Sequence, residues 1–293
     1  MTLPPQEWLI APGSGSPLVT RIAAEKVGWE HLNMVVLRLS REQPFELTIG
    51  QYEYAMVILS GRCNIKTSRG DYDNIGRREN VFAGMPYALY LPPNTEFKIE
   101  ALTEQVEIAA CWTGVAQSRN PRLIKPTDVT LDIVGGGTAT RQINTIIPPG
   151  DASQHLVVME TYTPSGSWST YPPHKHDTHR NDPNGKLVEA NLEEICYFKF
   201  DRPNGYAIQR IYTLDEEIDQ TFVVYSDDSI VIPRGYHTLV SAHGYSTYSL
   251  HVLAGSARAV AASDDPAYAW VRQTWTQKDP RLPIVDHGME PLA

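Results

Sequence analysis

The chain has 293 residues, 42% hydrophobic and 20% charged, a composition typical of a globular protein. Its formal net charge of -9 comes without a basic block, which argues against a nucleic-acid or anionic-membrane partner. No apolar run is long enough to cross a bilayer, the N-terminus lacks a signal-peptide pattern, and the three cysteines are scattered. We therefore expect a cytoplasmic protein that acts on a small molecule.

Short β-prone runs bounded by turn residues recur along the first part of the chain. They cover residues 33–39, 45–49, 54–59, 63–66, 80–82, 88–91, 97–99 and 106–112. Such spacing predicts an antiparallel sandwich or barrel. The only histidine before residue 125 is His31, so we interpret residues 1–125 as a metal-free, structural β domain.

The same rhythm restarts after the polar, proline-containing segment 117–121. The second set of runs covers residues 131–134, 142–147, 156–162, 194–200, 206–212, 222–224, 230–232 and 248–253. We therefore predict an all-β protein whose second domain spans residues 126–293. Residues 177–189 form a long polar loop in this half, which we expect to be a wall or lid over a site, the alternative being an exposed insertion.

A metal site is predicted in the second domain. In the run Tyr171-Pro172-Pro173-His174-Lys175-His176, strand alternation puts His174 and His176 on one side. Glu194 on a second strand and His237 after a Pro-x-Gly turn complete a mixed nitrogen and oxygen set. Such a set suits a divalent Zn, Mn or Fe(II) ion.

Alternation also decides which side chains near Glu194 point inward. Only one of Glu193 and Glu194 can do so, and we expect Glu194, Cys196 and Phe198 to point inward while Glu193 and Lys199 point outward. Cys196 would then line the pocket, either as a substrate contact or as packing. We assign no ligand role to His179, His243 and His251.

An anionic substrate would be held by basic side chains through charge-assisted hydrogen bonds. The candidates are Arg141, Arg180, Lys186, Arg210 and Arg234, of which we assign Arg180 and Lys186 to the substrate site. Gln209 and Tyr236 are placed to orient substrate hydroxyls, a tyrosine at a barrel mouth being as often packing.

With these residues assembled, the chain resembles the 5-deoxy-glucuronate isomerases of bacterial inositol catabolism. That family belongs to the two-cupin group that also contains the ketol-isomerases of the pectin pathway. The matching phrases include Gly84-Met85-Pro86, Pro172-Pro173-His174-Lys175-His176-Asp177, Leu192-Glu193-Glu194 and Pro233-Arg234-Gly235-Tyr236-His237. The resemblance implies a bicupin of two cupin-type β-barrels, with a metal held by positions matching His174, His176, Glu194 and His237. It also implies aldose–ketose isomerisation of a deoxy uronic acid, 5-deoxy-glucuronate to 5-dehydro-2-deoxygluconate.

The chain departs from the family pattern at three positions. Cys196 stands where an aromatic residue is usual, Thr238 where a proline follows Gly-Tyr-His, and His251 where an asparagine is expected. We expect these changes to alter the pocket lining and hence the exact sugar acid. The reaction type is expected to stay the same.

Isomerisation requires a group that moves a proton between two adjacent carbons of the substrate. Glu189 in the long loop is our choice of base, with Tyr236 and a metal-bound hydroxide as alternatives. Two other functions compete, an Fe(II) cupin dioxygenase and a non-catalytic sugar-acid-binding bicupin; a storage bicupin is a third, although such proteins need no ligand quartet. The sequence leaves open whether the subunits form a homo-oligomer.

Overall fold

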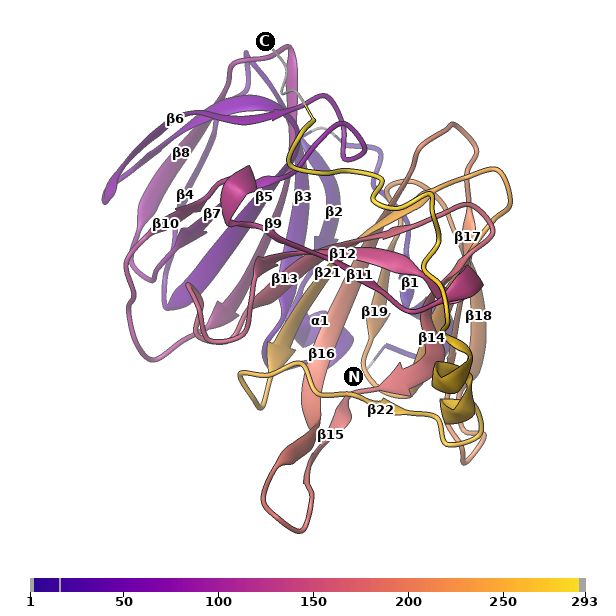
Figure 1. Ribbon diagram of the computed structural model, residues 1–293. Coiled ribbons are helices and arrows are strands. Elements are labelled where there is room, and N and C mark those ends of the chain that lie inside the picture. The colour runs from indigo at the N-terminus through magenta and orange to yellow at the C-terminus, as the bar shows by residue number, and fades with distance from the viewer. Residues whose placement is uncertain (1–2, 16, 290–293) are drawn as a thin grey trace.

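The computed structural model describes residues 3–15 and 17–289, and its regular structure is almost entirely β. Figure 1 shows two strand-built bodies side by side, one from the first half of the chain and one from the second. The C-terminal segment leaves the second body and runs back to the first. The all-β prediction with two β units is therefore confirmed.

The helical elements of the described residues are short. They are η1 (Pro5–Glu7), α1 (Ala24–Val27), η2 (Pro126–Asp128), η3 (Gly137–Ala139) and η4 (Ala269–Thr274). Within residues 3–15 and 17–289, no helix has both the length and the apolar character needed to span a membrane.

The first barrel is built from nine antiparallel strands that belong to one sheet. Six strands follow the order β10-β7-β5-β9-β3-β2, and β4, β6 and β8 pair beside them. The bounds are β2 (Leu18–Ile22), β3 (Asn33–Ser40), β4 (Phe45–Thr48), β5 (Tyr52–Thr67), β6 (Gly70–Arg78), β7 (Tyr87–Leu91), β8 (Glu96–Ala101), β9 (Gln105–Gly114) and β10 (Arg122–Ile124).

Strand β5 joins the two parts of this sheet. Its first half pairs with β7 and β9, and its second half pairs with β6 and β8. The pairing register shifts at Gly61, whose φ of +80° lies in the left-handed region. The two runs expected at 54–59 and 63–66 are thus one bulged strand, since Gly61 bends the chain without reversing it.

Two other expectations for the first half are wrong. Residues 80–82 form a turn, in which the Asn80 side chain accepts a hydrogen bond from the Phe82 N–H at 2.8 Å. This local bond offers the backbone an alternative to a strand. Strand β6, which is rich in charged residues and glycine, was not predicted.

The second barrel is built from two sheets. One follows the order β1-β19-β16-β21-β13-β12-β11, with β15 paired to β16, and the other follows β18-β17-β20-β14-β22. The bounds are β11 (Thr130–Val134), β12 (Arg141–Ile147), β13 (Val157–Thr163), β14 (Trp168–Lys175), β15 (Asp177–Asn181), β16 (Leu187–Phe200), β17 (Ala207–Tyr212), β18 (Asp219–Val224), β19 (Ser229–Ile232), β20 (Tyr236–Ser241), β21 (Thr247–Gly255) and β22 (Ser263–Asp264).

One strand from the beginning of the chain belongs to the second barrel. Strand β1 (Leu9–Ile10) pairs antiparallel with β19, with Leu9 opposite Ile230. The division between residues 125 and 126 lies between β10 and η2, and it stays a prediction.

Residues 177–189 are mostly strand, which corrects the expectation of a structureless loop. Strand β15 and the start of β16 form a hairpin, with Arg180 opposite Glu189. In Figure 1 this hairpin projects away from the body of the molecule. The polar residues of β15 concealed the hairpin, because this strand carries no apolar stripe on either face.

The barrels share one apolar core and several buried polar contacts. Val57 and Ala109 of the first barrel belong to the same buried cluster as Val158 and Ile195 of the second. Glu53 on β5 accepts hydrogen bonds from the N–H groups of residues 154, 155 and 156 at 2.7, 2.8 and 3.1 Å. Glu193 on β16 likewise accepts from the N–H groups of residues 30, 31 and 32. Each barrel therefore supplies a carboxylate that satisfies backbone donors of the other.

Candidate metal centre

Four of the predicted site residues meet inside the second barrel. His174 lies near the end of β14, directly opposite His237 of β20 in the strand pairing. Glu194 lies in β16, between Ile232 of β19 and Leu253 of β21. The two sheets therefore bring a carboxylate from one side of the barrel to imidazoles from the other.

The distances are those of a compact ligand cluster. One ring nitrogen from each of His174, His176 and His237 lies within 4.8 Å of the others. The Glu194 carboxylate reaches the same point, because its Oε2 lies 2.8 Å from His176 Nε2 and 3.4 Å from His237 Nε2. The alternation also matches the prediction, since Glu193 faces the first barrel and Glu194 the interior.

Backbone carbonyls fix the orientation of two imidazoles. His176 Nδ1 lies 3.1 Å from the Leu192 carbonyl, and His237 Nδ1 lies 3.2 Å from the Gly235 carbonyl. When these Nδ1–H groups donate, the Nε2 lone pairs point at the centre of the cluster, as in protein metal sites.

The turn before His237 depends on glycine. Gly235 has a φ of +99°, and a Cβ there would lie 2.7 Å from the Tyr212 carbonyl oxygen. The Asp177 carboxylate accepts a hydrogen bond from the Gly235 N–H at 2.8 Å. This turn and its acidic anchor set the entry of β20 and thus the position of His237.

The cluster holds more acceptors than donors, which is what a cation requires. His237 Nε2 is buried and has no hydrogen-bond partner among the described residues. With the Nδ1–H groups engaged elsewhere, the Nε2 atoms and the Glu194 oxygens all offer lone pairs. The donor set therefore fits a divalent metal ion such as Zn, Mn or Fe(II).

The pKa shifts agree with this balance. Burial and the adjacent imidazoles of His237 and His176 place the pKa of His174 well below its ordinary value. Burial opposes ionisation of Glu194, but the neighbouring side chains of His176, His237 and His251 hold its pKa well below the usual range. Burial also lowers the pKa of His176, but its hydrogen bond to Glu194 outweighs this and raises it. A metal ion binding here would displace the proton that His176 and Glu194 share.

His251 is a polar neighbour of the cluster, which sequence reasoning placed in the pocket lining without a contact to Glu194. Its Nδ1 lies 2.6 Å from Glu194 Oε1, and its Nε2 lies 2.9 Å from the Ser249 hydroxyl. Cys196 Sγ lies 3.3 Å from both Glu194 Oε1 and His251 Nδ1. The signal that could have found His251 is the strand pairing of β21 with β16, which sets His251 opposite Cys196.

Two predicted substrate residues line the interior beside the cluster. Cys196 and Gln209 border a cavity of about 10 Å³ together with His237 and His251. That volume holds roughly one water molecule, so side chains fill the barrel below the metal-binding atoms.

Glu189, the predicted base, is buried among cationic and N–H donors. Its Oε1 lies 2.6 Å from Lys175 Nζ and accepts hydrogen bonds from the N–H groups of Asp177 and Thr178. Arg180 approaches its other oxygen at 3.7 Å.

Tyr236 lies near Glu189, on the side of the sheet opposite to His237. Successive side chains alternate along β14 and β20, so Lys175 and Tyr236 leave the face opposite to His174 and His237. Burial raises the pKa of Tyr236, with Lys175 and Glu189 among its charged neighbours. Its ring centroid is 5.7 Å from that of Tyr212.

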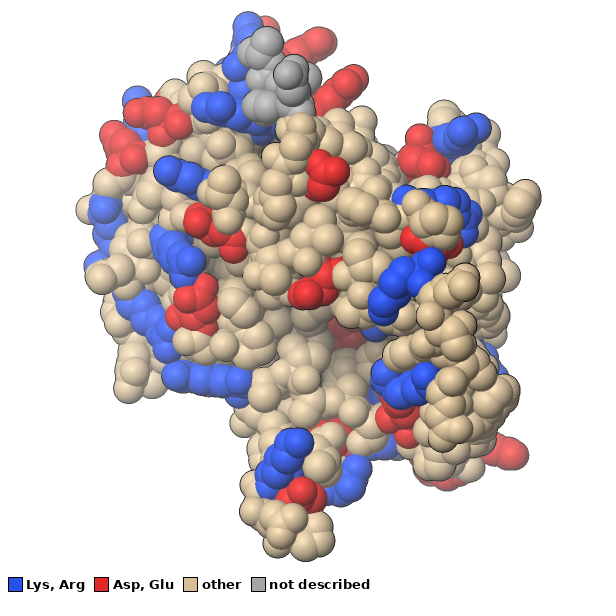
Figure 2. Space-filling view, in the orientation of Figure 1, with Lys and Arg blue, Asp and Glu red and all other residues tan. Residues whose placement is uncertain are grey.

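Most of the basic candidates are engaged in other contacts. Arg210 pairs with Asp219 at 2.8 Å, Arg234 with Glu217 at 2.6 Å, and Arg180 donates to the Ser263 hydroxyl at 2.9 Å. Lys186 is exposed in the turn of the projecting hairpin. Arg141 differs from all of these because its side chain makes no hydrogen bond or ion pair with the described residues. In Figure 2 basic and acidic side chains are interspersed over the visible face.

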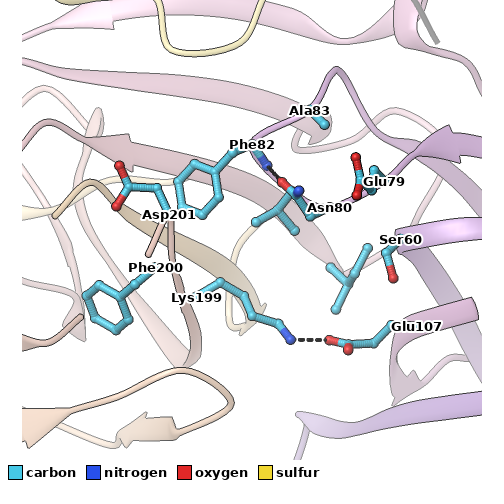
Figure 3. A pocket seen from close by; sticks show the side chains of 11 residues that line it. Ser60, Glu79, Asn80, Phe82, Ala83, Glu107, Lys199, Phe200 and Asp201 are labelled. Atoms are coloured by element: carbon cyan, nitrogen blue, oxygen red, sulfur yellow. Dashed lines mark hydrogen bonds and ion pairs between the residues drawn. The ribbon is translucent and has the colours of Figure 1, made fainter. Parts of the chain in front are cut away.

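A wider hollow lies elsewhere, between the barrels. Its volume is about 440 Å³, and Figure 3 shows the side chains that line it, among them Phe82, Glu107, Lys199 and Asp201. The charge of Lys199 is neutralised there, because its Nζ forms ion pairs with Glu107 at 2.7 Å and with Asp227 at 2.6 Å. The hollow is lined without a histidine, and in the part of the chain that the structure describes both groups of possible metal ligands lie in the second barrel.

Comparison with known proteins agrees with this geometry. The family model of the KduI/IolB family matches residues 8–271. The 5-deoxy-glucuronate isomerase of Geobacillus thermodenitrificans is 37% identical over 257 residues, which cover 87% of this chain and 92% of that protein. The 5-deoxy-glucuronate isomerase of Bacillus subtilis strain 168 is 32% identical over 260 residues, or 88% of this chain and 94% of that protein.

Solved structures give the same picture. The crystal structure of an IolB-like protein from Salmonella typhimurium LT2 superposes with a TM-score of 0.85 at 32% identity, covering 90% of this chain and 98% of that one. The oxalate decarboxylase of Lactobacillus farciminis matches with a TM-score of 0.60 at 11% identity, covering 87% and 88%. At that identity the second match shows the fold alone, which is the predicted bicupin.

Proposed function

The chain belongs to the KduI/IolB family, and from that premise we propose that it is a metal-dependent aldose–ketose isomerase converting 5-deoxy-glucuronate to 5-dehydro-2-deoxygluconate in myo-inositol catabolism. The observation that carries the proposal is the cluster of His174, His176, Glu194 and His237, with a buried imidazole nitrogen that lacks a partner. Its support outside the structure is the name shared by relatives up to 37% identical over most of the chain.

The four residues would hold one divalent ion, for which we propose Zn, Mn or Fe(II). When bound, such an ion supplies Lewis-acid stabilisation for the negative charge that develops on two adjacent substrate oxygens. The protein contributes fixed ligand positions, because carbonyl groups orient His176 and His237 and because His251 holds Glu194. Cys196 and Gln209 are proposed to contact the substrate from the barrel wall, and Arg180 and Lys186 from the hairpin.

The reaction moves a proton from C2 of the aldose to C1 and the C2 hydroxyl proton to the C1 oxygen, which leaves a ketone at C2 and a hydroxymethyl group at C1. Glu189 and Tyr236 remain our candidates for the group that moves it. Glu189→Gln and Tyr236→Phe distinguish them, since loss of the proton-transfer group lowers kcat by about 10²–10⁴-fold. The other variant should retain kcat within a few fold, and retention by both would remove both residues from this role.

The central experiment combines metal analysis with turnover. Purified protein is analysed for bound metal and incubated with 5-deoxy-glucuronate in deuterated water, and the product is followed by NMR. We expect the ketose, with solvent deuterium at the new hydroxymethyl carbon. His237→Ala should lose metal and activity, whereas His243→Ala, which removes an exposed imidazole, should keep both.

The competing functions give different results in the same assay. A dioxygenase would consume oxygen, whereas the isomerase should run equally well without it. A binding protein would take up the sugar acid and release no product. Absence of conversion with Zn, Mn and Fe(II) alike would overturn the isomerase proposal.

We also propose a cytoplasmic location. Its support is that Cys63, Cys111 and Cys196 are all free, buried thiols, the usual state of cysteines in a reducing compartment. The proposed partner is the small sugar acid, without nucleic acid or membrane.

A further inference from the structure

Arg141 is a half-buried cation with an unused guanidinium. It opens β12, where its backbone pairs with Val134 of β11. Among residues 3–15 and 17–289 its side chain makes no hydrogen bond or ion pair. A guanidinium carries five N–H donors, and removing them from water without an acceptor is costly.

The position of Arg141 is beside the metal-binding cluster. In the sheet, Ile143 lies opposite Thr161, Thr161 opposite Ser249, and Ser249 opposite Phe198. Side chains two residues apart on a strand share a face, so Arg141 leaves the same face as Ile143, and this is the face that carries Phe198 and Glu194. Asp264 of β22 lies opposite His174 in the strand pairing. It is the acidic side chain that interacts electrostatically with Arg141. Arg141 therefore lies at the same end of β14 as the metal ligands.

The nearby acidic group does not neutralise Arg141. Asp264 is taken by Arg272, whose Nη2 donates to it at 2.7 Å and whose guanidinium lies 4.8 Å from the Trp275 ring centroid. Burial and the neighbouring charge of Arg272 lower the pKa of Arg141 to about 10. At neutral pH the side chain is thus charged, poorly hydrated and without an acceptor.

A uronic acid has the complementary group. Its aldehyde and its carboxylate stand at opposite ends of one six-carbon chain, so an isomerase must place the aldehyde end at the metal and hold a carboxylate some distance away. A planar guanidinium matches a carboxylate with two parallel N–H donors. The other candidate arginines have fewer free N–H donors for a carboxylate than Arg141, because they are exposed or already bonded. They are Arg180, Arg210 and Arg234.

We propose that Arg141 binds the substrate carboxylate and thereby selects uronic acids over neutral sugars. This inference rests on the proposed function, because it assumes that the substrate of the metal site is a sugar acid. It assigns Arg141 to substrate binding and orientation, with no part in proton transfer.

The test compares two substrates and two variants. Arg141→Gln removes the charge, and Arg210→Gln is the matched control because its guanidinium is exposed and paired with Asp219. For 5-deoxy-glucuronate we expect Arg141→Gln to lower kcat/KM by about 10–150-fold, mainly through KM. For 5-deoxy-glucose, which has the same aldehyde and no carboxylate, wild type and Arg141→Gln should be equal. Arg210→Gln should match wild type on both.

Two failures can be told apart. If wild type converts 5-deoxy-glucuronate and Arg141→Gln does so equally well, the role of Arg141 is overturned while the isomerase stands. If wild type converts nothing, the isomerase fails and Arg141 is judged by calorimetric titration with D-glucuronate and D-glucose. Wild-type binding of the acid that Arg141→Gln loses would support the inference, and unchanged or absent binding would overturn it.

Folding is controlled separately. Metal content and thermal unfolding of Arg141→Gln should equal those of wild type. If this variant does not fold, Arg141→Lys replaces it, because an ammonium keeps the charge but not the two-donor geometry. A loss of kcat/KM confined to the acid substrate then supports the inference, and no loss contradicts it.

Discussion

At the scale of single residues, the metal centre is controlled by which atoms donate protons and which accept them. Glu194 illustrates this, because one carboxylate oxygen faces the His176 and His237 nitrogens while the other meets His251 at 2.6 Å. His251 thereby fixes the plane of the carboxylate. A group that orients a ligand in this way usually affects metal affinity without touching the metal.

Replacement of His251 should therefore weaken metal binding. We expect His251→Ala to lower the affinity for Zn about 10–100-fold, because Glu194 loses the donor that orients it. His251→Asn should recover part of this loss, since its amide can donate to the same oxygen. Competition with a chromophoric chelator measures the affinities, and His179→Asn serves as the control. Equal affinities in His251→Ala and wild type would show that Glu194 needs no such support.

Sequence reasoning worked at this scale where it depended on alternation along one strand. It separated Glu194 from Glu193 because neighbouring side chains must leave opposite faces. It could not predict the contact of His251 with Glu194, since that contact follows from the register between β16 and β21, in which His251 lies opposite Cys196, 55 positions away in the chain. It could not show either that Arg141 lacks a partner, because the pairing of Arg272 with Asp264 depends on tertiary structure.

At the scale of elements, the long strand β5 depends on one glycine. Gly61 combines a φ of +80° with close contact, since a Cβ there would lie 2.4 Å from the Gln105 carbonyl oxygen. Backbone atoms cannot yield as a flexible side chain does. The bulge at this position allows β5 to pair with β7 and β9 and then with β6 and β8.

Gly61→Ala should therefore destabilise the protein substantially. We expect the free energy of unfolding to fall by at least about 2 kcal/mol, from left-handed strain plus the clash. Gly114→Ala is the matched control at the end of β9, where an added Cβ meets nothing within 4 Å. Urea unfolding followed by tryptophan fluorescence measures both. A Gly61→Ala protein as stable as Gly114→Ala would mean that the strand can shift to accommodate a methyl group.

The existence of elements was easier to predict than their extent. Apolar runs such as 106–112 and 142–147 identified β9 and β12 because one face of each is buried. The hairpin of β15 and β16 was missed because Asp177–Asn181 is polar throughout. Its pairing comes from backbone hydrogen bonds, which leave no apolar pattern in the sequence.

At the scale of the whole molecule, buried charges join the two barrels. Arg78 of β6 pairs with Glu160 of β13 at 2.6 Å, and both side chains are almost fully buried. Tyr162 and Tyr248 also donate to Glu160. Removing one member leaves the other charge buried without compensation.

Arg78→Met should thus cost about 3–5 kcal/mol of unfolding free energy. The double variant Arg78→Met with Glu160→Gln should regain part of it, because the uncompensated carboxylate is gone. The exposed ion pair of Arg210 with Asp219 serves as the comparison. Its loss in Arg210→Gln should change the free energy of unfolding by less than about 1 kcal/mol. A double-mutant cycle measured in urea gives the coupling, and a coupling near zero would contradict this account.

A second interface cluster should make stability pH-dependent. Burial tends to raise the pKa of Asp227, but Lys199, Tyr197 and Arg38 outweigh it and lower the pKa. A carboxyl whose pKa is lower in the folded state stabilises the fold above its unfolded pKa, and this contribution is lost as pH falls through the folded value. The loss should begin below about pH 4.

Asp227→Asn should accordingly flatten the acid side of the stability curve. Unfolding free energies measured between neutral pH and pH 3 should fall less steeply for this variant than for wild type. Asp219→Asn is the control. Asp219 also pairs with an arginine, Arg210, but both side chains of this pair are exposed to solvent. Identical acid slopes in wild type and Asp227→Asn would place the pH dependence elsewhere.

The pairing of β1 with β19 affects how the protein is made. Leu9 and Ile10 leave the ribosome well before their partners Ile230 and Ser229 are translated. During that interval β1 has no partner strand and is available to strands of other nascent chains. A substitution at Leu9 or Ile10 should therefore affect the metal barrel, and the yield of intact protein should fall under translation conditions that favour encounters between unfinished chains.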